Sequence, residues 1–114
     1  AEIRAFASNI GVARKSDGFN ALSLVFPNQS RVVAVPADGD KVRGFSSVSM
    51  IVVDEAARVP DEAYHGLTPM LARSSGVVWL MSTPKGRTGF FHDIWHANSP
   101  DWTRVFATVD DCTA

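Results

Sequence analysis

Cysteine is almost absent from this sequence, and so is any excess of charge of one sign. The only cysteine is Cys112, so no disulfide can form within the chain, and a disulfide-stapled secreted fold is disfavoured. Eleven lysines and arginines face twelve aspartates and glutamates, for a net charge of −1. The chain therefore has neither the strong positive charge that is typical of nucleic-acid-binding proteins nor an acidic tail.

Long hydrophobic runs are also missing. Apolar stretches such as residues 50–53 are far too short to span a membrane, and the first residues do not show the basic-then-apolar pattern expected of a signal peptide. Hydrophobic residues make up 46% and charged residues 20%, which is ordinary globular composition and excludes wholesale disorder. The 114 residues suffice for one domain, and because the sequence starts at Ala1 without a methionine, we expect a piece of a longer protein.

The amino-terminal third of the chain predicts a β-hairpin. Residues 1–12 carry apolar side chains at helix-like spacing and predict either a short helix or an irregular segment. Residues 21–26 and 31–35 read as strands, and residues 27–30 between them are turn-forming. Residues 36–44 have the composition of a polar loop.

Three strands are predicted in the remainder of the chain. Residues 49–53 and 77–81 are continuous apolar runs, which are typical of strands buried on both faces of a parallel sheet. Residues 102–109 alternate well enough to predict a last strand.

Two helices are predicted between these strands. Pro60 stands where a first helical turn would start, Gly76 is expected to stop that helix, and Pro69 predicts a break or kink within it. Residues 90–97 predict the second helix. The order strand, helix, strand, helix, strand predicts an α/β fold with a mostly parallel sheet.

Polar side chains follow two of the predicted strands at their carboxyl ends. Asp54 and Glu55 come directly after the first strand, and Ser82 and Thr83 follow the second. Ligands of open α/β sheets bind outside the carboxyl ends of the strands. One carboxylate can bind Mg²⁺ while the other orients or deprotonates an attacking water. Taken alone, an apolar run before Asp-Glu is a weak motif and is more often a strand that ends in solvated acids, which cap the next helix.

Three further segments stand out in order along the chain: an Arg-Gly-x-Ser element within residues 41–46, the segment 54–62 with its continuation at 70–72, and the segment 80–91. Together they resemble the ATPase domain of phage terminase large subunits, the motors that package viral DNA into procapsids. Each segment is a weak signal, and their order along the chain makes the resemblance fairly specific.

The resemblance implies a fold and a set of roles. The fold would be a partial P-loop NTPase of the ASCE type, with three layers, a mostly parallel sheet and an upstream hairpin, and residues 1–114 would be the carboxyl-terminal portion of the ATPase domain. Asp54 would be the Walker B aspartate that holds Mg²⁺, and Glu55 the catalytic glutamate that activates water. Ser82 and Thr83 would belong to the coupling motif that senses the γ-phosphate of ATP.

Partners and location follow from the same resemblance. The partners would be ATP, Mg²⁺, double-stranded DNA, the portal protein and the small terminase subunit, with a homo-oligomeric ring in the full-length protein and no membrane. The location would be the cytoplasm of the infected bacterium. Arg43, Lys85 and Arg87 are candidates for contacts with DNA or a neighbouring subunit, although loop cations are as often simply solvated.

The chain departs from that family in one respect. No Gly-x-x-x-x-Gly-Lys-Ser/Thr sequence occurs in it, so no residues of that motif wrap the phosphates or supply their lysine. In the family that loop and a nuclease domain flank the matching segment. We therefore expect the chain alone to hydrolyse ATP poorly or not at all, and to leave sheet edges and apolar faces uncovered. A helicase-like nucleic-acid-dependent ATPase fragment and a non-catalytic remnant or interaction module remain alternatives.

Overall fold

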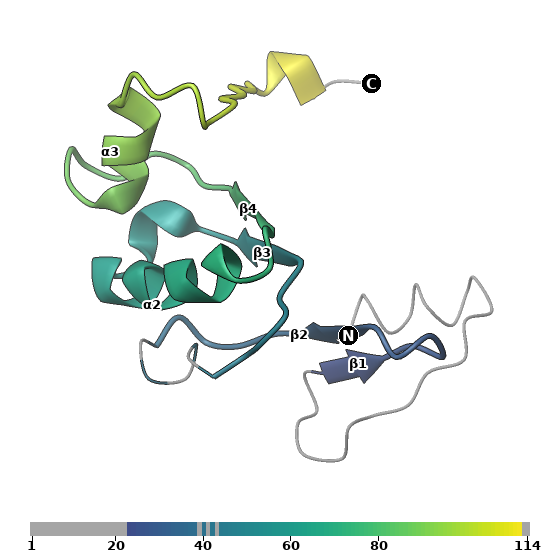
Figure 1. Cartoon of the computed structure of the whole chain (residues 1–114). Coiled ribbons are helices and arrows are strands. Elements are labelled where there is room, and N and C mark those ends of the chain that lie inside the picture. Colours follow the sequence, from purple (N-terminus) through teal and green to yellow (C-terminus); the bar gives the residue numbers. More distant parts are fainter. Residues whose placement is uncertain (1–22, 39, 41, 43, 113–114) are drawn as a thin grey trace.

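The computed structural model describes residues 23–38, 40, 42 and 44–112, which form a mixed α/β arrangement (Figure 1). The segment 1–12, for which a helix was one prediction, lies outside the described residues. In chain order the elements are β1 (Ser23–Val25), β2 (Arg31–Val33), β3 (Met50–Val53), the 3₁₀ turn η1 (Ala56–Arg58), α2 (Asp61–Ala72), β4 (Val77–Leu80), α3 (Phe90–His96) and the 3₁₀ turn η2 (Asp110–Cys112). Neither α-helix of this part of the chain has the length and hydrophobicity that crossing a bilayer needs.

The predicted hairpin is confirmed as the antiparallel pair β1–β2, with Ser23 opposite Val33. Its turn is closed by the Phe26 N–H, which donates to the Ser30 carbonyl oxygen at 2.8 Å. The Asn28 side-chain oxygen accepts from the Ser30 N–H at 3.0 Å. The turn therefore uses the local side-chain chemistry for which asparagine is favoured in such loops.

The predicted parallel pairing is confirmed between β3 and β4. Met50 lies opposite Val77, and Val53 lies opposite Leu80. Parallel neighbours need a crossover connection, and α2 provides it (Figure 1). Because the first residues of the two strands lie opposite each other and so do the last, both strands end at the same edge of the sheet.

One face of the β3–β4 sheet packs against both helices. The buried cluster joins Val53 of β3, Leu67 of α2 and Phe90 of α3 with Ala56 and Val42. Val42 comes from the segment predicted to be a polar loop, yet its side chain is only 3% exposed. That loop therefore contributes to the core as well as connecting the hairpin to β3.

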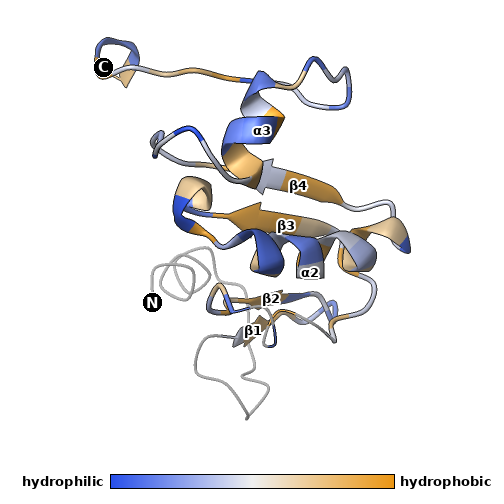
Figure 2. Cartoon of the chain, turned by 90° about the vertical axis from the view of Figure 1, so that its left-hand side faces the viewer, coloured by the Kyte–Doolittle hydropathy of each residue, from blue (hydrophilic) through white to orange (hydrophobic). Residues whose placement is uncertain are grey.

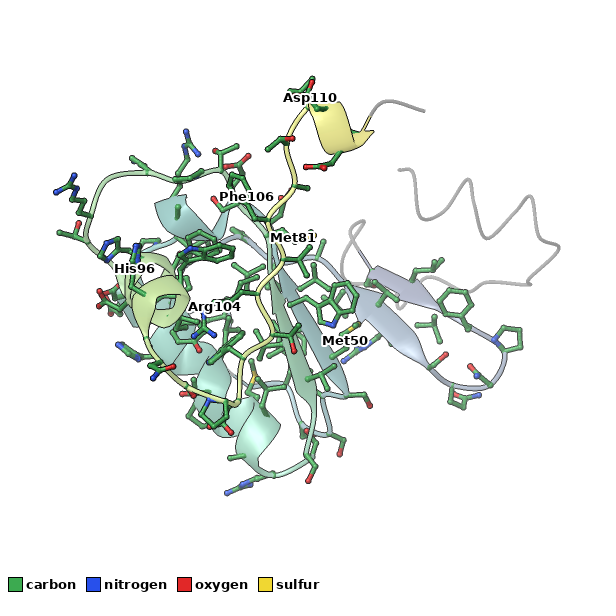
Figure 3. The ribbon with its side chains drawn as sticks, turned by 90° about the horizontal axis from the view of Figure 1, so that it is seen from above. Met50, Met81, His96, Arg104, Phe106 and Asp110 are labelled. Atoms are coloured by element: carbon green, nitrogen blue, oxygen red, sulfur yellow. The ribbon has the colours of Figure 1, made fainter. Side chains whose placement is uncertain are left out.

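The prediction that both strands are buried on two faces is wrong, because the described helices cover only one. The expectation that the chain leaves an apolar sheet face uncovered is confirmed. Alternate side chains on the other face are exposed, from 45% at Met81 to 57% at Trp79. This open face is made by residues Met50, Val52, Val77, Trp79 and Met81. Figure 2 shows the hydrophobic character of both strands, and Figure 3 shows Met50 on the side of the sheet away from the helices.

A break or a kink was predicted at Pro69, and the break does not occur, since α2 continues to Ala72. Proline removes the N–H that would pair with the carbonyl of the residue four positions earlier, which is His65. The Thr68 hydroxyl donates to that carbonyl oxygen at 3.1 Å. The neighbouring side chain thus compensates for the missing backbone hydrogen bond.

The prediction that Gly76 ends α2 is wrong. The helix ends at Ala72, and the left-handed residue that follows is Ser75, with φ 53°. A Cβ atom on Gly76 would lie 2.5 Å from the Val48 carbonyl oxygen and 2.8 Å from Leu71 Cδ2. Glycine is required here because the chain entering β4 passes close to the chain entering β3.

The predicted strand at 102–109 is wrong as well, because this segment forms no ladder with the described strands. Arg104 instead donates to carbonyl oxygens at the end of α3, at 2.8 Å to Trp95 and 3.0 Å to Ile94 (Figure 3). These carbonyls lack partners within the helix, so the guanidinium acts as a cap. Val105 and Phe106 are 80% and 73% exposed.

Replacement of Gly76 by alanine tests the close approach of the two chain segments. We expect Gly76→Ala to lower the free energy of unfolding by about 1–3 kcal/mol, because the new methyl group overlaps a backbone carbonyl. Urea unfolding followed by circular dichroism measures it. Gly86→Ala is the control, since the space around Gly86 is open and only its φ of 67° opposes a side chain. An equal loss in the two variants would contradict the packing argument.

The single tyrosine gives the fold a pH dependence. Tyr64 stacks on Phe90 with ring centroids 4.2 Å apart, and burial raises the pKa of its phenol above the ordinary value of 10.0. The unfolded chain therefore loses this proton first. The stabilising contribution is complete below pH 10 and is lost as the pH rises through the folded-state pKa.

We expect a phenolate absorbance titration of the folded chain to give a Tyr64 pKa above 10.0, and addition of urea to return it to that value. Tyr64 is the only tyrosine, so the absorbance change reports this group alone. Tyr64→Phe should remove part of the alkaline loss of stability in urea unfolding. A phenol that titrates at or below its ordinary pKa in the folded chain would show that the ring is not buried.

Candidate functional site

The ends of β3 and β4 meet in a small hydrogen-bonded edge. The Met81 N–H donates to the Val53 carbonyl oxygen, and the Ala56 N–H donates back to the Met81 carbonyl oxygen, both at 3.0 Å. The chain after β3 is thereby tied to the chain after β4. The strand-end residues 54–55 and 82–83 lie at this edge as a result.

Asp54 is the first polar residue after β3, and its side chain is exposed. Its Oδ1 atom accepts a hydrogen bond from the Glu55 N–H at 2.9 Å. The other carboxylate oxygen makes no hydrogen bond within the described residues. Asp54 therefore offers a free oxygen at the open edge of the sheet.

Glu55 adopts a left-handed backbone conformation, with φ 52° and ψ 42°. For a residue with a Cβ this conformation costs on the order of 1–2 kcal/mol. It turns the chain sharply from β3 into η1, where the Arg58 N–H donates to the Glu55 carbonyl oxygen at 2.8 Å. The strained residue thus presents its carboxylate at the corner between strand and turn.

Arg58 faces Glu55 from the other end of η1. Its Nη1 atom donates to Glu55 Oε2 at 2.7 Å and lies 3.4 Å from Thr83 Oγ1. Both charged side chains are about half exposed, at 51% for Arg58 and 57% for Glu55. At this exposure solvent screens the ion pair, so its main effect is on geometry and not on stability.

Ser82 fastens η1 to the end of β4. Its hydroxyl accepts from the Ala57 N–H at 3.1 Å and donates to the Thr83 carbonyl oxygen at 2.7 Å. The N–H groups at the start of a helical turn have no partner inside the turn. Ser82 supplies one such partner from the segment after β4.

The structure brings four of the candidate residues together, namely Asp54, Glu55, Ser82 and Thr83. Arg43 lies outside the described residues. The other two cations are exposed in the loop between β4 and α3 and form no hydrogen bond or ion pair with a described residue; they are Lys85 and Arg87.

Arg58 is the residue of this edge that the sequence reasoning did not single out. The signal was its position three residues after Glu55, a spacing that brings opposite charges together on a helical turn. The spacing indicates an ion pair only if a helical turn is already known to begin after Glu55. A strand ending in two acids does not reveal the 3₁₀ turn that follows.

The donor set at this edge suits a hard divalent cation. Carboxylate and hydroxyl oxygens are the protein ligands that Mg²⁺ prefers, and it is commonly held by one or two carboxylates together with substrate phosphates and waters. No group of three or more histidine, cysteine, aspartate or glutamate side chains in the described part of the chain forms a closed metal site. Asp54 fits the open kind of Mg²⁺ site.

The edge is a surface and not an enclosed cleft, with Asp54, Glu55 and Thr83 exposed. Shallow hollows in the described part of the chain lie elsewhere, for example along α2 and at the hairpin turn. Neither hollow is lined by a residue of the strand-end edge. A ligand at this edge would need further contacts to exclude water.

The strain at Glu55 leads to a stability test. We expect Glu55→Gly to raise the free energy of unfolding by up to about 1 kcal/mol, because glycine accepts the left-handed conformation and the lost ion pair is weak. Glu62→Gly in the first turn of α2 is the matched control and should lower it by about 1 kcal/mol. Urea unfolding of the three proteins decides this, and a destabilised Glu55→Gly variant would show that the carboxylate has a structural role.

Comparison with protein-family models, with curated proteins and with solved structures found no match.

Proposed function

We propose that this chain is a segment of the ATP-hydrolysing motor domain of a viral terminase large subunit, which drives double-stranded DNA into procapsids. The observation that carries the proposal is the parallel register of β3 and β4. It brings Asp54 and Glu55 to the same edge as Ser82 and Thr83, the residues that resemble that family's motifs. The proposal includes a three-layer P-loop NTPase fold, of which the described residues supply a two-stranded parallel sheet with helices on one face.

Asp54 would hold Mg²⁺ through the carboxylate oxygen that has no partner among the described residues. When bound, Mg²⁺ would neutralise charge on the transferred phosphoryl group. Glu55 would orient the attacking water and take its proton, since its carboxylate is exposed at the adjacent corner. Two neighbouring acids can take these separate roles because adjacent side chains point in different directions.

Ser82 and Thr83 would couple hydrolysis to movement. The Ser82 hydroxyl holds the Ala57 N–H, so a shift of η1 during hydrolysis is transmitted to the end of β4. The 114 residues contain no Gly-x-x-x-x-Gly-Lys-Ser/Thr, so the cradle for the ATP phosphates must come from other residues. DNA, the portal protein, the small subunit and neighbouring copies in a ring are the partners of the proposed motor.

A second candidate function is supported by the open face of the sheet. Five large apolar side chains are exposed there, and such a face is typical of an interaction surface. A non-catalytic interaction module with the same fold would need this face but would not need Asp54 or Glu55.

The proposal is tested by expressing the chain together with the coding sequence upstream of its Ala1 codon and measuring ATP hydrolysis by that protein. We expect that sequence to encode Gly-x-x-x-x-Gly-Lys-Ser/Thr and the protein to show Mg²⁺-dependent ATP hydrolysis. Asp54→Asn and Glu55→Gln should each lower kcat by about 10²–10⁴-fold, because each removes a group acting on the phosphoryl group or the water. Residues 1–114 alone should show no Mg²⁺-dependent turnover.

The control for these variants is Asp101→Asn, which removes an exposed carboxylate in the loop after α3 and should leave kcat unchanged. Hydrolysis that survives both Asp54→Asn and Glu55→Gln would refute the assigned roles. An upstream sequence without a phosphate-binding loop, together with no hydrolysis, would favour the interaction module.

A further inference from the structure

One guanidinium nitrogen joins the two strand ends. Arg58 Nη1 donates to Glu55 Oε2 at 2.7 Å and to Thr83 Oγ1 at 3.4 Å. The carboxylate belongs to the segment after β3 and the hydroxyl to the segment after β4. A change of charge or position at either oxygen therefore alters the donor that the other oxygen uses.

The backbone around Arg58 holds this bridge in place. The residues before it in η1 are tied to the end of β4 by the Ala56 and Ala57 N–H groups, which donate to the Met81 carbonyl oxygen at 3.0 Å and to the Ser82 hydroxyl at 3.1 Å. These hydrogen bonds hold η1 beside the segment after β4, so the Arg58 side chain lies within hydrogen-bonding distance of Thr83. Both contacts come from Nη1, whose N–H directions are fixed in the plane of the guanidinium, whereas the ammonium of a lysine rotates freely and would hold the two oxygens less well.

We propose that Arg58 is a positioning residue that links Glu55 to Thr83, so that the state of the Glu55 carboxylate is transmitted to the chain after β4. The role of this link in hydrolysis rests on the proposed function, in which Glu55 acts on the attacking water and Thr83 belongs to the coupling motif. Arg58 would then pass a change at Glu55 to the exposed loop that carries Lys85 and Arg87.

Nuclear magnetic resonance of the chain without nucleotide tests the link. We expect Glu55→Gln to shift the Thr83 methyl and amide signals when Arg58 is present, because the guanidinium loses its anionic partner. The same substitution in an Arg58→Gln background should leave the Thr83 signals unchanged. An equal Thr83 shift in both backgrounds, or no shift in either, would overturn the proposal.

The matched control is Arg87→Gln, which removes an exposed arginine of the same region that makes no hydrogen bond or ion pair with a described residue. In that background the response of Thr83 to Glu55→Gln should be fully retained. Arg58→Lys keeps the charge and serves as the second background if Arg58→Gln does not fold. The Thr83 response should be reduced there, and an undiminished response would contradict bridging by the guanidinium.

The link and the proposed function fail separately. The Thr83 response is measured without ATP, so its presence or absence does not depend on hydrolysis. Loss of hydrolysis in Asp54→Asn and Glu55→Gln tests the function without reference to Arg58. In a hydrolysing protein Arg58→Gln should lower kcat and leave the KM for ATP unchanged, with Arg58→Lys partly restoring kcat. A purely structural role for Arg58 would not give this pattern.

Discussion

The parallel register of β3 and β4 is the constraint on which the rest of the structure depends. Val53 lies opposite Leu80, so the last apolar residues of the two strands are neighbours and the polar residues after them share one edge. A slip of one residue would exchange the two faces of a strand and would move Ile51 and Val53 out of the helix-covered core. Core packing and the geometry of the candidate site are therefore fixed by the same register.

The β3–β4 sheet is buried on one face, and this limits the stability of the described fold. Ile51, Val53 and Leu80 pack toward α2 and α3, while Val52 and Trp79 are exposed on the opposite face. An apolar sheet face in contact with water forgoes the free energy that its burial would provide, about 25 cal/mol per Å². The stability of this arrangement thus depends heavily on the small cluster between the sheet and the two helices.

The turn after β3 connects that packing to the chemistry of the edge. Ala56 is 1% exposed and anchors η1 in the core, while Glu55 and Arg58 on either side of it reach solvent. The left-handed backbone of Glu55 is tolerated because η1 is held by hydrogen bonds to Met81 and Ser82. Backbone strain maintained by surrounding contacts is a common feature of functional sites.

Local patterning determined the hairpin, the parallel strands, the two helices and the strand-end positions of Asp54 and Ser82, because turn chemistry and apolar periodicity act over a few residues. Tertiary structure alone decided which face of the sheet is covered, since an apolar run reads the same with one helical layer or two. It also decided that residues 102–109 form no strand, because Arg104 ties this segment to the end of α3 and the segment pairs with neither outer edge of the β3–β4 sheet. The contact of Arg58 with Thr83 likewise joins segments 25 positions apart, which no local pattern can specify.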